Sequence, residues 1–490
     1  MSTATPVIAR DTFLAGLNDL PAHCVIHDAA ELRPYECDGL SAYRVQPWLV
    51  LLPESIGQVQ GILRYCQSCG VAVVARGAGT GLSGGALPLD NGVLLSLAKF
   101  NRILEVDAEN RLAKVQPGVR NLAISQAVAE LGLYYAPDPS SQIACSIGGN
   151  VAENAGGVHC LKYGLTVQNI ASLEVITIDG ERLAIGSAAL DTPGYDLLAL
   201  MTGSEGLLGV IVEVTVRLLP VPERAQVILA AFDAVETAGE AVAAIISAGI
   251  LPAGLEMMDT LAIRAAEDFV HAGYPTDAAA ILLCELDGTN EDVSVKIGEV
   301  RNLLKSMGAS QVRTAQDEQE RQRFWAGRKA AFPAVGRISP DYYCMDGTIP
   351  RKHLGKVLAT ISQWSDEYQL PVANVFHAGD GNLHPLILYD ANKPGELERA
   401  EKFGSRILEL SVSVGGTITG EHGVGMEKIN EMCVQFNNAE LTQFHTIKAA
   451  FDPQGLLNPG KAIPTLVRCA EFGSMHVHNG ELPFPDIDRF

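Results

Sequence analysis

Short apolar runs alternate with amphipathic stretches along the first 220 residues. Residues 71–77 form a β-branched apolar run that predicts a buried strand, and residues 56–70 have the spacing of a helix that ends at a glycine. By the same criteria, further strands are predicted at 47–55, 92–97, 103–107, 112–118, 171–180 and 208–220, and a helix runs from residue 121 to Gly132. Gly and Asn dominate residues 146–164, so we expect a long loop there.

Helical periodicity dominates after Pro220. Helices are predicted at 235–249, 291–307, 316–335, 351–368, 395–414 and 440–451, and strands at 226–232, 280–286, 343–349, 372–376 and 386–389. This order favours an α+β fold with a mostly antiparallel sheet. The expected divisions are a helical lead-in (1–45), a first domain (46–222), a second domain (223–465) and a C-terminal tail (466–490).

Composition excludes several classes of protein. Hydrophobic residues make up 47% of the 490 and the net charge is −21, which fits a large core and argues against nucleic-acid binding. No signal-peptide core is visible, and the longest apolar run, residues 241–255, is too short to span a bilayer. The ten cysteines lack iron–sulfur spacing and favour a reducing cytoplasm. Cys66 and Cys69 are interpreted as one helical turn, with a redox or metal pair as the alternative.

Two glycine-rich motifs in the second half carry candidate chemistry. HAGDGNLHP places His377 and His384 seven residues apart, and GEHGVGMEK adds the adjacent Glu421 and His422. Two imidazoles and a carboxylate suit a borderline divalent metal with an open coordination position. A further imidazole there could move a proton. The alternative is that each histidine is a hydrogen-bonded structural residue.

A third glycine-rich motif, RGAGTGLSGGA at 76–86, follows a predicted strand. It matches G-x-G-x-x-G, but Pro88 and the turn signal Asn91-Gly92 predict another strand where a Rossmann unit needs a helix. The glycines still allow backbone N–H groups to converge on a pyrophosphate. A flexible surface loop is the alternative.

The order of the motifs resembles a known family. RGAGTGLSGGA, PDPSS (137–141), IGGNVAENAGG (147–157) and TGSEGLLGVI (202–211) resemble the FAD-binding domain shared by vanillyl-alcohol oxidase and p-cresol methylhydroxylase (PCMH). GLEMMD (254–259), CMDGTIPR (344–351), the two histidine motifs and FDPQGLLNPGK (451–461) resemble the C-terminal domain of FAD-linked 2-hydroxyacid dehydrogenases. The resemblance is strongest to the glycolate oxidase branch, with D-lactate and D-2-hydroxyglutarate dehydrogenases as near relatives. It implies a PCMH-type FAD-binding domain of two subdomains, followed by an α+β cap domain.

The resemblance also implies residue roles. It assigns FAD binding to Arg76, Gly77, Ala78, Gly79, Thr80, Gly81, Leu82, Ser83, Gly84, Gly85, Pro137, Ser140, Ser141, Gly148, Asn150, Asn154, Gly157, Ile211, Asn458 and Lys461. Covalent-flavin relatives often carry histidine where this chain has Thr80, so we expect non-covalent FAD. The divalent metal, Zn²⁺ or Mn²⁺, is expected on His377, His384 and Glu421. His422 is expected to act as general base, and Arg328 to bind the substrate carboxylate.

The implied reaction is oxidation of a 2-hydroxy acid, with metal-assisted deprotonation of the hydroxyl and hydride transfer to flavin N5. Relatives that act on D-2-hydroxyglutarate carry lysine where this chain has Cys344, so glycolate or D-lactate is expected. The expected partners are an iron–sulfur subunit and a second flavoprotein-like subunit, which pass electrons to quinone. The expected location is cytoplasmic, peripheral to the inner face of the membrane. The alternatives are a D-2-hydroxyglutarate or other D-2-hydroxyacid dehydrogenase, a metal-dependent hydrolase, and a non-catalytic flavoprotein subunit.

Overall fold

The computed structural model describes residues 8–17, 20–189 and 193–465. The chain forms two compact units. Unit 1 comprises the ranges 1–156, 165–220 and 421–490, and unit 2 comprises 157–164 and 221–420. The sequence predicts one boundary between the first and second domains, near residue 222. The compact units differ from it because residues 157–164 belong to unit 2, and because the chain returns to unit 1 at Glu421. The predicted tail at 466–490 lies outside the described residues.

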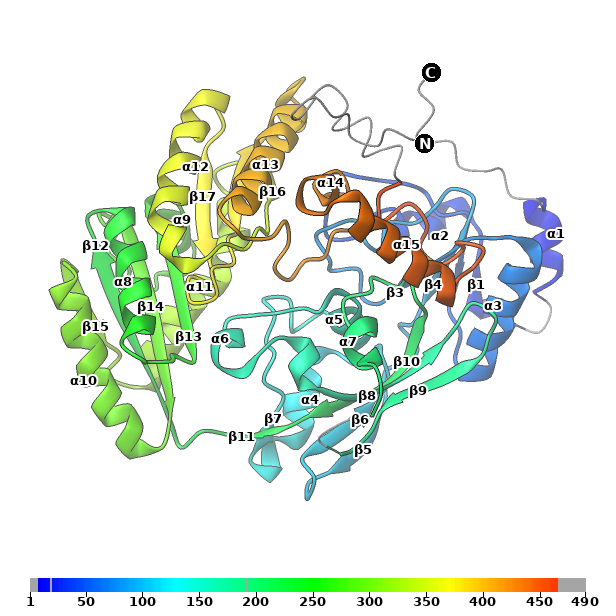
Figure 1. Ribbon diagram of the computed structural model, residues 1–490, viewed down its shortest axis with the longest axis horizontal. Helices are drawn as coiled ribbons and strands as arrows, with labels where there is room; N and C mark the ends of the chain where they lie inside the picture. Colours follow the sequence, from blue (N-terminus) through cyan, green and yellow to red (C-terminus); the bar gives the residue numbers. More distant parts are fainter. Residues whose placement is uncertain (1–7, 18–19, 190–192, 466–490) are drawn as a thin grey trace. The chain divides into compact units, whose positions relative to one another are not determined.

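Unit 1 contains a four-stranded sheet of order β1-β2-β4-β3. Its strands are β1 (Val25–Ile26), β2 (Leu49–Leu51), β4 (Val93–Ser96) and β3 (Val73–Arg76). Strands β2 and β3 both pair parallel to β4, and α3 (Ile56–Cys69) connects β2 to β3 (Figure 1). The Ser55 side chain caps the first turn of α3, and Gly70 ends it with φ of +64°. The apolar face of α3 packs on this sheet through Val59, Ile62 and Leu63.

A five-stranded antiparallel sheet of order β5-β6-β10-β8-β9 forms the second layer of unit 1. Its strands are β5 (Ile103–Asp107), β6 (Leu112–Val115), β10 (Val210–Arg217), β8 (Ile170–Ile176) and β9 (Arg182–Gly186). Two helices, α4 (Asn121–Val128) and α5 (Ile147–Glu153), contribute apolar side chains to its core. The remaining elements of unit 1 are α1 (Arg10–Ala15), α2 (Ala29–Leu32), β7 (Leu133–Tyr134), α7 (Leu197–Met201), β11 (Leu219–Pro220), α14 (Met432–Gln435) and α15 (Asn438–Phe451).

The prediction of one long loop at 146–164 is wrong. The segment contains α5 and a short helix α6 (Cys160–Tyr163). Gly148 lies within α5. The helix packs so closely there that a Cβ on this residue would lie 2.5 Å from Pro117 Cβ. Asn154 ends α5 in the left-handed conformation, with φ of +54°. Close packing, and not flexibility, accounts for this glycine.

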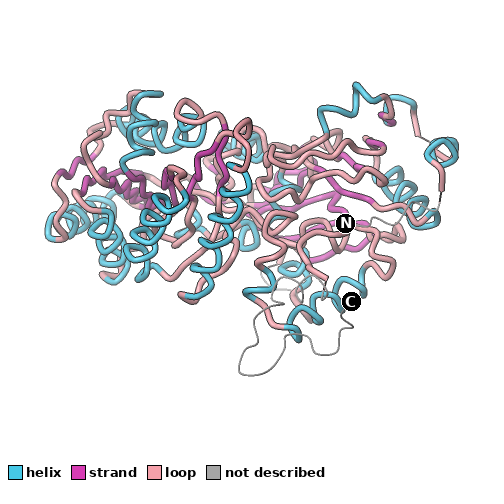
Figure 2. Tube along the Cα trace, turned by 90° about the horizontal axis from the view of Figure 1, so that it is seen from above, coloured by secondary structure: helices cyan, strands magenta, loops and turns pink. Residues whose placement is uncertain are grey.

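Unit 2 contains a seven-stranded sheet of order β15-β12-β14-β13-β17-β18-β16, in which every neighbouring pair is antiparallel. Figure 2 draws the strands of the chain in magenta and its helices in cyan. The strands are β12 (Arg224–Phe232), β13 (Gly254–Asp259), β14 (Ala280–Gly288), β15 (Gln311–Thr314), β16 (Asp341–Cys344), β17 (Val372–Phe376) and β18 (Pro385–Tyr389). The helices are α8 (Val235–Ser247), α9 (Thr260–Val270), α10 (Asn290–Ser306), α11 (Glu318–Val335), α12 (Leu354–Tyr368) and α13 (Glu396–Ser413). The predicted α+β fold with a mostly antiparallel sheet is confirmed. Strands β13 and β15 and helix α9 were not predicted.

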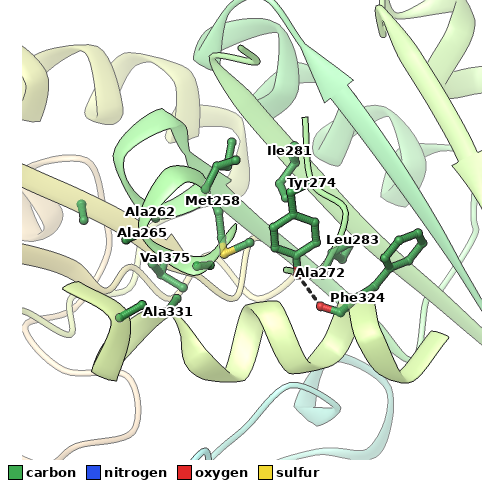
Figure 3. Close-up of a cluster of buried hydrophobic side chains, with 14 of the residues drawn as sticks. Met258, Ala262, Ala265, Ala272, Tyr274, Ile281, Leu283, Phe324, Ala331 and Val375 are labelled. Atoms are coloured by element: carbon green, nitrogen blue, oxygen red, sulfur yellow. Dashed lines mark hydrogen bonds between the residues drawn. The ribbon is translucent and has the colours of Figure 1, made fainter. Parts of the chain in front are cut away.

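Helix α11 is fixed by a large apolar cluster of unit 2. Phe324 and Ala331 of α11 pack with Ala265 of α9 and with Met258 and Val375 of the sheet (Figure 3). Alanine at the helix contacts lets α9 and α11 lie close together. The Tyr274 hydroxyl donates a hydrogen bond to the Phe324 carbonyl. These contacts set which side chains α11 presents to β13 and β14. Among the helices of the described ranges, none has the length and apolar composition needed to cross a bilayer.

Candidate functional site

The glycine-rich loop at 76–85 leaves β3 and leads to β4 without an intervening helix, as predicted. Two of its glycines have φ values near +70°, at Gly79 and Gly84. At Gly77, a Cβ would lie 2.2 Å from Ser146 Oγ. The loop therefore requires glycine for backbone conformation and for close approach. A Rossmann interpretation is excluded because no helix N-terminus follows the motif.

Arg76, at the start of this loop, is almost fully buried. Its Nη1 donates to the Cys37 carbonyl at 2.8 Å, and its guanidinium lies 5.9 Å from the Tyr35 ring centre. Burial lowers the pKa of Arg76, and the nearby Asp38 opposes this shift. Arg76 is thus a fixed positive group beside the glycine loop.

Three sequence motifs far apart in the chain meet at this loop. Asn458 Nδ2 donates to the carbonyls of Gly85 at 3.1 Å and Glu205 at 2.7 Å. Lys461 Nζ also donates to the Gly85 carbonyl, at 2.9 Å. Burial lowers the pKa of Lys461 to about 7, although Asp38 and Glu205 act in the opposite direction. The structure therefore brings Gly85, Asn458 and Lys461 together, as a common ligand site requires.

A second set of predicted residues meets at α5. Asn121 Nδ2 donates to the Pro137 carbonyl at 3.0 Å and to Asn150 Oδ1 at 3.1 Å, so one side chain joins two predicted contacts. The loop before β10 runs along the same helix, because Gly203 N donates to the Val151 carbonyl at 2.8 Å. Asn121 was not predicted. The sequence gives little signal for it, because asparagine is common near helix N-termini and its burial appears only in the folded chain.

The remaining predicted FAD residues lie at separate positions. Ser140 and Ser141 lie in the turns before α5, and Gly148 lies within α5. Ile211 is buried on β10 beside an irregularity in the pairing with β8. Gly157 is the first residue of unit 2. Among the described residues, no hydrogen bond joins Ser140, Ser141, Gly148 and Ile211 to one another.

The residues of unit 1 fit a flavin cofactor. Ser83 is fully buried, and its hydroxyl has no hydrogen-bond partner among the described residues. Such groups are normally satisfied. Gly79 and Gly81 have no side chain that would cover the loop surface, and the basic residues Arg76 and Lys461 lie beside the loop. A pyrophosphate with its two negative charges matches this donor set.

Unit 2 buries a polar centre on its sheet. His377 follows β17 and His384 precedes β18, with ring centres 5.1 Å apart and 3% and 2% of their surfaces exposed. The turn between them is closed by hydrogen bonds from His377 N to the Asn382 carbonyl and from Gly381 N to the His377 carbonyl. Gly381 has φ of +79°, and a Cβ there would lie 2.1 Å from the Ile349 carbonyl oxygen. The predicted histidine pair is therefore brought together by a turn that needs glycine.

Each of these histidines faces a buried carboxylate. Glu256 Oε1 lies 2.8 Å from His377 Nδ1, and Asp346 Oδ1 lies 3.5 Å from His384 Nε2. Asp346 Oδ2 also accepts hydrogen bonds from Thr419 Oγ1 at 2.6 Å and from Gly420 N at 3.0 Å. Neither carboxylate was among the predicted site residues. Their signal is an acidic residue inside an otherwise apolar motif, in GLEMMD and in CMDGTIP.

Arg328 is not a solvated surface residue, because only 1% of its surface is exposed. Its Nε and Nη2 bind Glu256 Oε2 at 2.8 Å and 2.7 Å. Burial alone would raise the pKa of Glu256, but its contacts with His377 and Arg328 outweigh burial and leave this pKa below its usual value. Arg328, Glu256 and His377 therefore form one chain of charge-assisted hydrogen bonds.

Glu421 and His422 begin the last section of unit 1. Glu421 is bonded directly to Gly420, whose amide is held by Asp346. The backbone after His422 is fixed inside unit 1, because Val424 N and Gly425 N both donate to the Glu205 carboxylate at 2.7 Å. Burial raises the pKa of Glu205. Hydrogen bonds to Glu205 therefore hold the backbone just after Glu421, the predicted metal ligand, and His422, the predicted base.

The C-x-x-C motif lies within α3, as predicted. Cys66 is fully buried, and burial raises the pKa of its thiol. A thiol that does not ionise is unreactive and a poor metal ligand. Cys66 is therefore interpreted as a structural residue of the hydrophobic core.

Two segments of the sequence match models of known protein families. Residues 47–186 match the FAD binding domain, and residues 221–462 match the C-terminal domain of FAD linked oxidases. The chain is 67% identical over 488 residues to the glycolate oxidase subunit GlcD of Escherichia coli (strain K12), covering 99% of this chain and 98% of that protein. It is 39% identical to the Bacillus subtilis protein of the same name, over 87% of this chain and 91% of that protein. A D-lactate dehydrogenase of Archaeoglobus fulgidus is 32% identical, over 86% of this chain and 92% of that protein.

Solved structures of distant sequence share the fold. The 4-ethylphenol oxidase from Gulosibacter chungangensis aligns with a TM-score of 0.78 and 19% identity, covering 94% of this chain and 99% of that one. A substrate-bound p-cresol methylhydroxylase aligns with a TM-score of 0.77 and 19% identity, over 94% and 96% of the two chains. The predicted PCMH-type fold is confirmed. With its two matched domains in this order and its near-complete coverage of relatives, the chain belongs to the family of FAD-linked oxidases and is an FAD-dependent oxidoreductase.

Proposed function

We propose that this enzyme oxidises a short 2-hydroxy acid, glycolate or D-lactate, to the corresponding 2-oxo acid. The main support is the polar centre of unit 2, in which His377 and His384 lie together, His377 contacts Glu256 at 2.8 Å and His384 lies 3.5 Å from Asp346. Two imidazoles beside carboxylates are a typical donor set for Zn²⁺ or Mn²⁺. The names of the glycolate oxidase and D-lactate dehydrogenase relatives agree with this class of substrate.

We assign His377, His384 and Glu421 as the metal ligands. When bound, the divalent cation supplies a Lewis acid that makes the substrate hydroxyl more acidic. His377 presents Nε2, because its Nδ1 is engaged by Glu256. Glu421 is the nearest carboxylate in sequence to Gly420, whose amide is fixed on Asp346 beside His384. This donor set draws ligands from both glycine-rich motifs.

His422 is assigned as the general base that removes the hydroxyl proton, since imidazole titrates near neutral pH. Arg328 is assigned to the substrate carboxylate. Glu256 binds the Nε and Nη2 edge of its guanidinium, so the carboxylate would take the Nη1 side. Arg328 is buried, so its ion pair with the substrate carboxylate would form away from water, where an oriented charge acts more strongly.

FAD, when bound, supplies the acceptor for the hydride from the α-carbon. We assign the cofactor to the glycine loop at 76–85, together with Asn458 and Lys461. Thr80 replaces a flavin-attaching side chain in this loop, so the cofactor is proposed to be non-covalent. The electrons are proposed to leave through an iron–sulfur subunit and a second flavoprotein-like subunit, in keeping with the relatives' description as a subunit.

The preference for a monocarboxylate rests on Cys344. This residue of β16 is buried, and its Sγ donates to the Met345 carbonyl at 3.5 Å. A neutral thiol gives a second carboxylate no counter-charge. The structure offers no observation in favour of a metal-dependent hydrolase, which would leave the glycine loop at 76–85 without a ligand.

The proposal is tested by anaerobic mixing of the purified holoenzyme with glycolate, D-lactate, L-lactate and D-2-hydroxyglutarate while flavin absorbance near 450 nm is followed. We expect glycolate or D-lactate to bleach the flavin fastest. A higher kcat/KM for D-2-hydroxyglutarate would overturn the substrate assignment. A flavin that none of the four acids reduces would overturn the proposed reaction.

A further inference from the structure

Two neighbouring strands of unit 2 each bury one glutamate under the same helix. Glu256 on β13 and Glu285 on β14 are both 1% exposed. Each is ion-paired with an arginine of α11, Glu256 with Arg328 and Glu285 with Arg321. The two arginines are seven residues apart, two helical turns, so they lie on the same face of α11.

The two glutamates differ in their other partners. Glu285 also accepts hydrogen bonds from Trp325 Nε1 at 2.5 Å and faces His159 Nε2 at 3.2 Å. Glu256 contacts the imidazole of His377 instead, at 2.8 Å. Two similar buried ion pairs therefore lie side by side on the sheet, and only one of them touches a proposed metal ligand.

We propose that Glu256 is a positioning residue for the metal site: it holds His377 as the Nδ1–H tautomer and leaves Nε2 for the metal. This inference rests on the proposed metal site in unit 2. An ionised carboxylate only accepts hydrogen bonds, so the nitrogen that faces it must carry the proton. A neutral imidazole then has its lone pair on the other nitrogen. Such a contact also fixes the ring plane.

Arg328 makes this arrangement possible. A buried carboxylate without a counter-charge would be costly and would tend to take up a proton. The Arg328 guanidinium binds Oε2 through two nitrogens and leaves Oε1 for His377. Both oxygens of Glu256 are therefore committed, one to each partner.

Glutamine cannot replace Glu256 in this role. The amide has one oxygen acceptor and one NH₂ donor, whereas Arg328 and His377 Nδ1 both need an acceptor. If the amide oxygen faces Arg328, the NH₂ group donates to His377 Nδ1. The proton of the neutral imidazole must then lie on Nε2. If the oxygen faces His377, two donors oppose each other at Arg328. Either orientation weakens the metal site or its support.

The test compares Glu256→Gln with Glu285→Gln in the FAD-loaded enzyme. Glu285→Gln is the matched control, because it also removes the charge of a buried, arginine-bound glutamate but has no contact with His377. Dissociation constants for Zn²⁺ and Mn²⁺ are measured by chelator competition, and the flavin-to-protein ratio and thermal midpoint are measured on the same samples. We expect Glu256→Gln to weaken metal binding about 10- to 100-fold with flavin retained, and Glu285→Gln to bind metal like the wild type.

Two further variants separate the possible failures. His384→Ala tests the proposed metal site itself, and metal binding unchanged in this variant would overturn that site. If His384→Ala loses metal while Glu256→Gln binds it like the wild type, the positioning role is overturned and the site stands. Should Glu256→Gln fail to fold, Glu256→Asp replaces it. Aspartate keeps the charge but is too short to reach both partners, so weaker metal binding is again expected, and wild-type affinity would refute the role.

Discussion

Lys461 donates a hydrogen bond to the carbonyl of Gly85 at 2.9 Å, although 376 residues separate them in the sequence. Gly85 ends the loop that the sequence marks as the pyrophosphate site. Lys461 is 2% exposed, and burial lowers its pKa to about 7. Burial disfavours the charged form of this lysine. Its retention there indicates that the loop requires a fixed hydrogen-bond donor.

We therefore expect Lys461→Met to weaken FAD retention at least about tenfold, because a hydrogen bond from a charged group contributes roughly 1.5–3 kcal/mol. The measurement is the flavin-to-protein absorbance ratio after desalting, followed by titration with free FAD. Lys402→Met is the control, since Lys402 makes only an exposed ion pair with Glu398. Equal flavin affinity in the two variants would contradict the prediction.

Thr80 gives a prediction about the attachment of the flavin. This half-exposed residue lies in the glycine loop and has no nucleophilic imidazole. Acid precipitation of the holoenzyme should therefore release the yellow chromophore into the supernatant. A pellet that stays yellow after washing would show a covalent flavin and refute the assignment.

Glu285 predicts a specific response to acid. Burial alone would raise the pKa of Glu285, but the hydrogen bond and charge of His159 and the charge of Arg321 lower it to about 2, below the ordinary value of 4.5. As pH falls, the unfolded chain takes up this proton first, so the stabilisation is complete above about pH 4.5 and is lost towards pH 2. This pKa shift corresponds to about 3 kcal/mol in the free energy of unfolding.

Glu285→Gln should accordingly be less stable than the wild type at pH 7, and the difference should shrink as pH falls from about 4.5 to 2. Urea denaturation of both proteins at a series of pH values checks this. A stability difference that stays constant over that range would exclude the assigned pKa.

Gly381 allows a test of the turn that joins the two histidines. Gly381→Ala should destabilise the protein by more than the roughly 1–2 kcal/mol of a left-handed alanine, because its Cβ would lie 2.1 Å from the Ile349 carbonyl oxygen. Gly395→Ala is the control, with φ of +80° and no atom within 4 Å of the added Cβ. Denaturant titration and metal content are compared, and equal losses in both variants would show that the carbonyl contact is unimportant.

His422→Ala should abolish turnover while leaving flavin bound, because His422 is assigned to proton transfer and not to the flavin loop. Steady-state oxidation of the best substrate is measured together with the flavin ratio. His445→Ala provides the comparison, since His445 Nε2 lies 2.9 Å from the Pro464 carbonyl oxygen and has no assigned role in the reaction. Wild-type turnover in His422→Ala would return this histidine to a structural role.

The sequence predicted most helices and strands, but it missed the strand that carries Glu256. GLEMMD is almost continuously apolar and only six residues long, and periodicity cannot separate a short buried strand from a helix or a turn. The loop prediction at 146–164 failed for a related reason. Gly148 reads as flexible by composition, whereas its close packing on Pro117 makes it part of a helix.

The candidate site was predicted unevenly as well. The histidines and Arg328 occur in motifs, so their residue types are visible in the sequence. Their carboxylate partners are not, because Glu256 meets His377 across 121 residues through strand pairing and helix packing. Selection of a partner across such a distance depends on the folded sheet and not on local spacing.

The eight-residue segment 157–164 belongs to unit 2, although it precedes the rest of that unit by more than 50 residues in the sequence. This arrangement matters for the design of fragments and chimaeras. His159 faces Glu285, Lys162 and Tyr163 bind Asp287, and a Cβ on Gly254 would lie 2.8 Å from Val158. A fragment that begins at Val221 would lack this segment and leave two buried carboxylates short of donors. Chimaeras between members of the family should therefore transplant residues 157–164 with the downstream half, because a single cut at the apparent linker divides a folding unit.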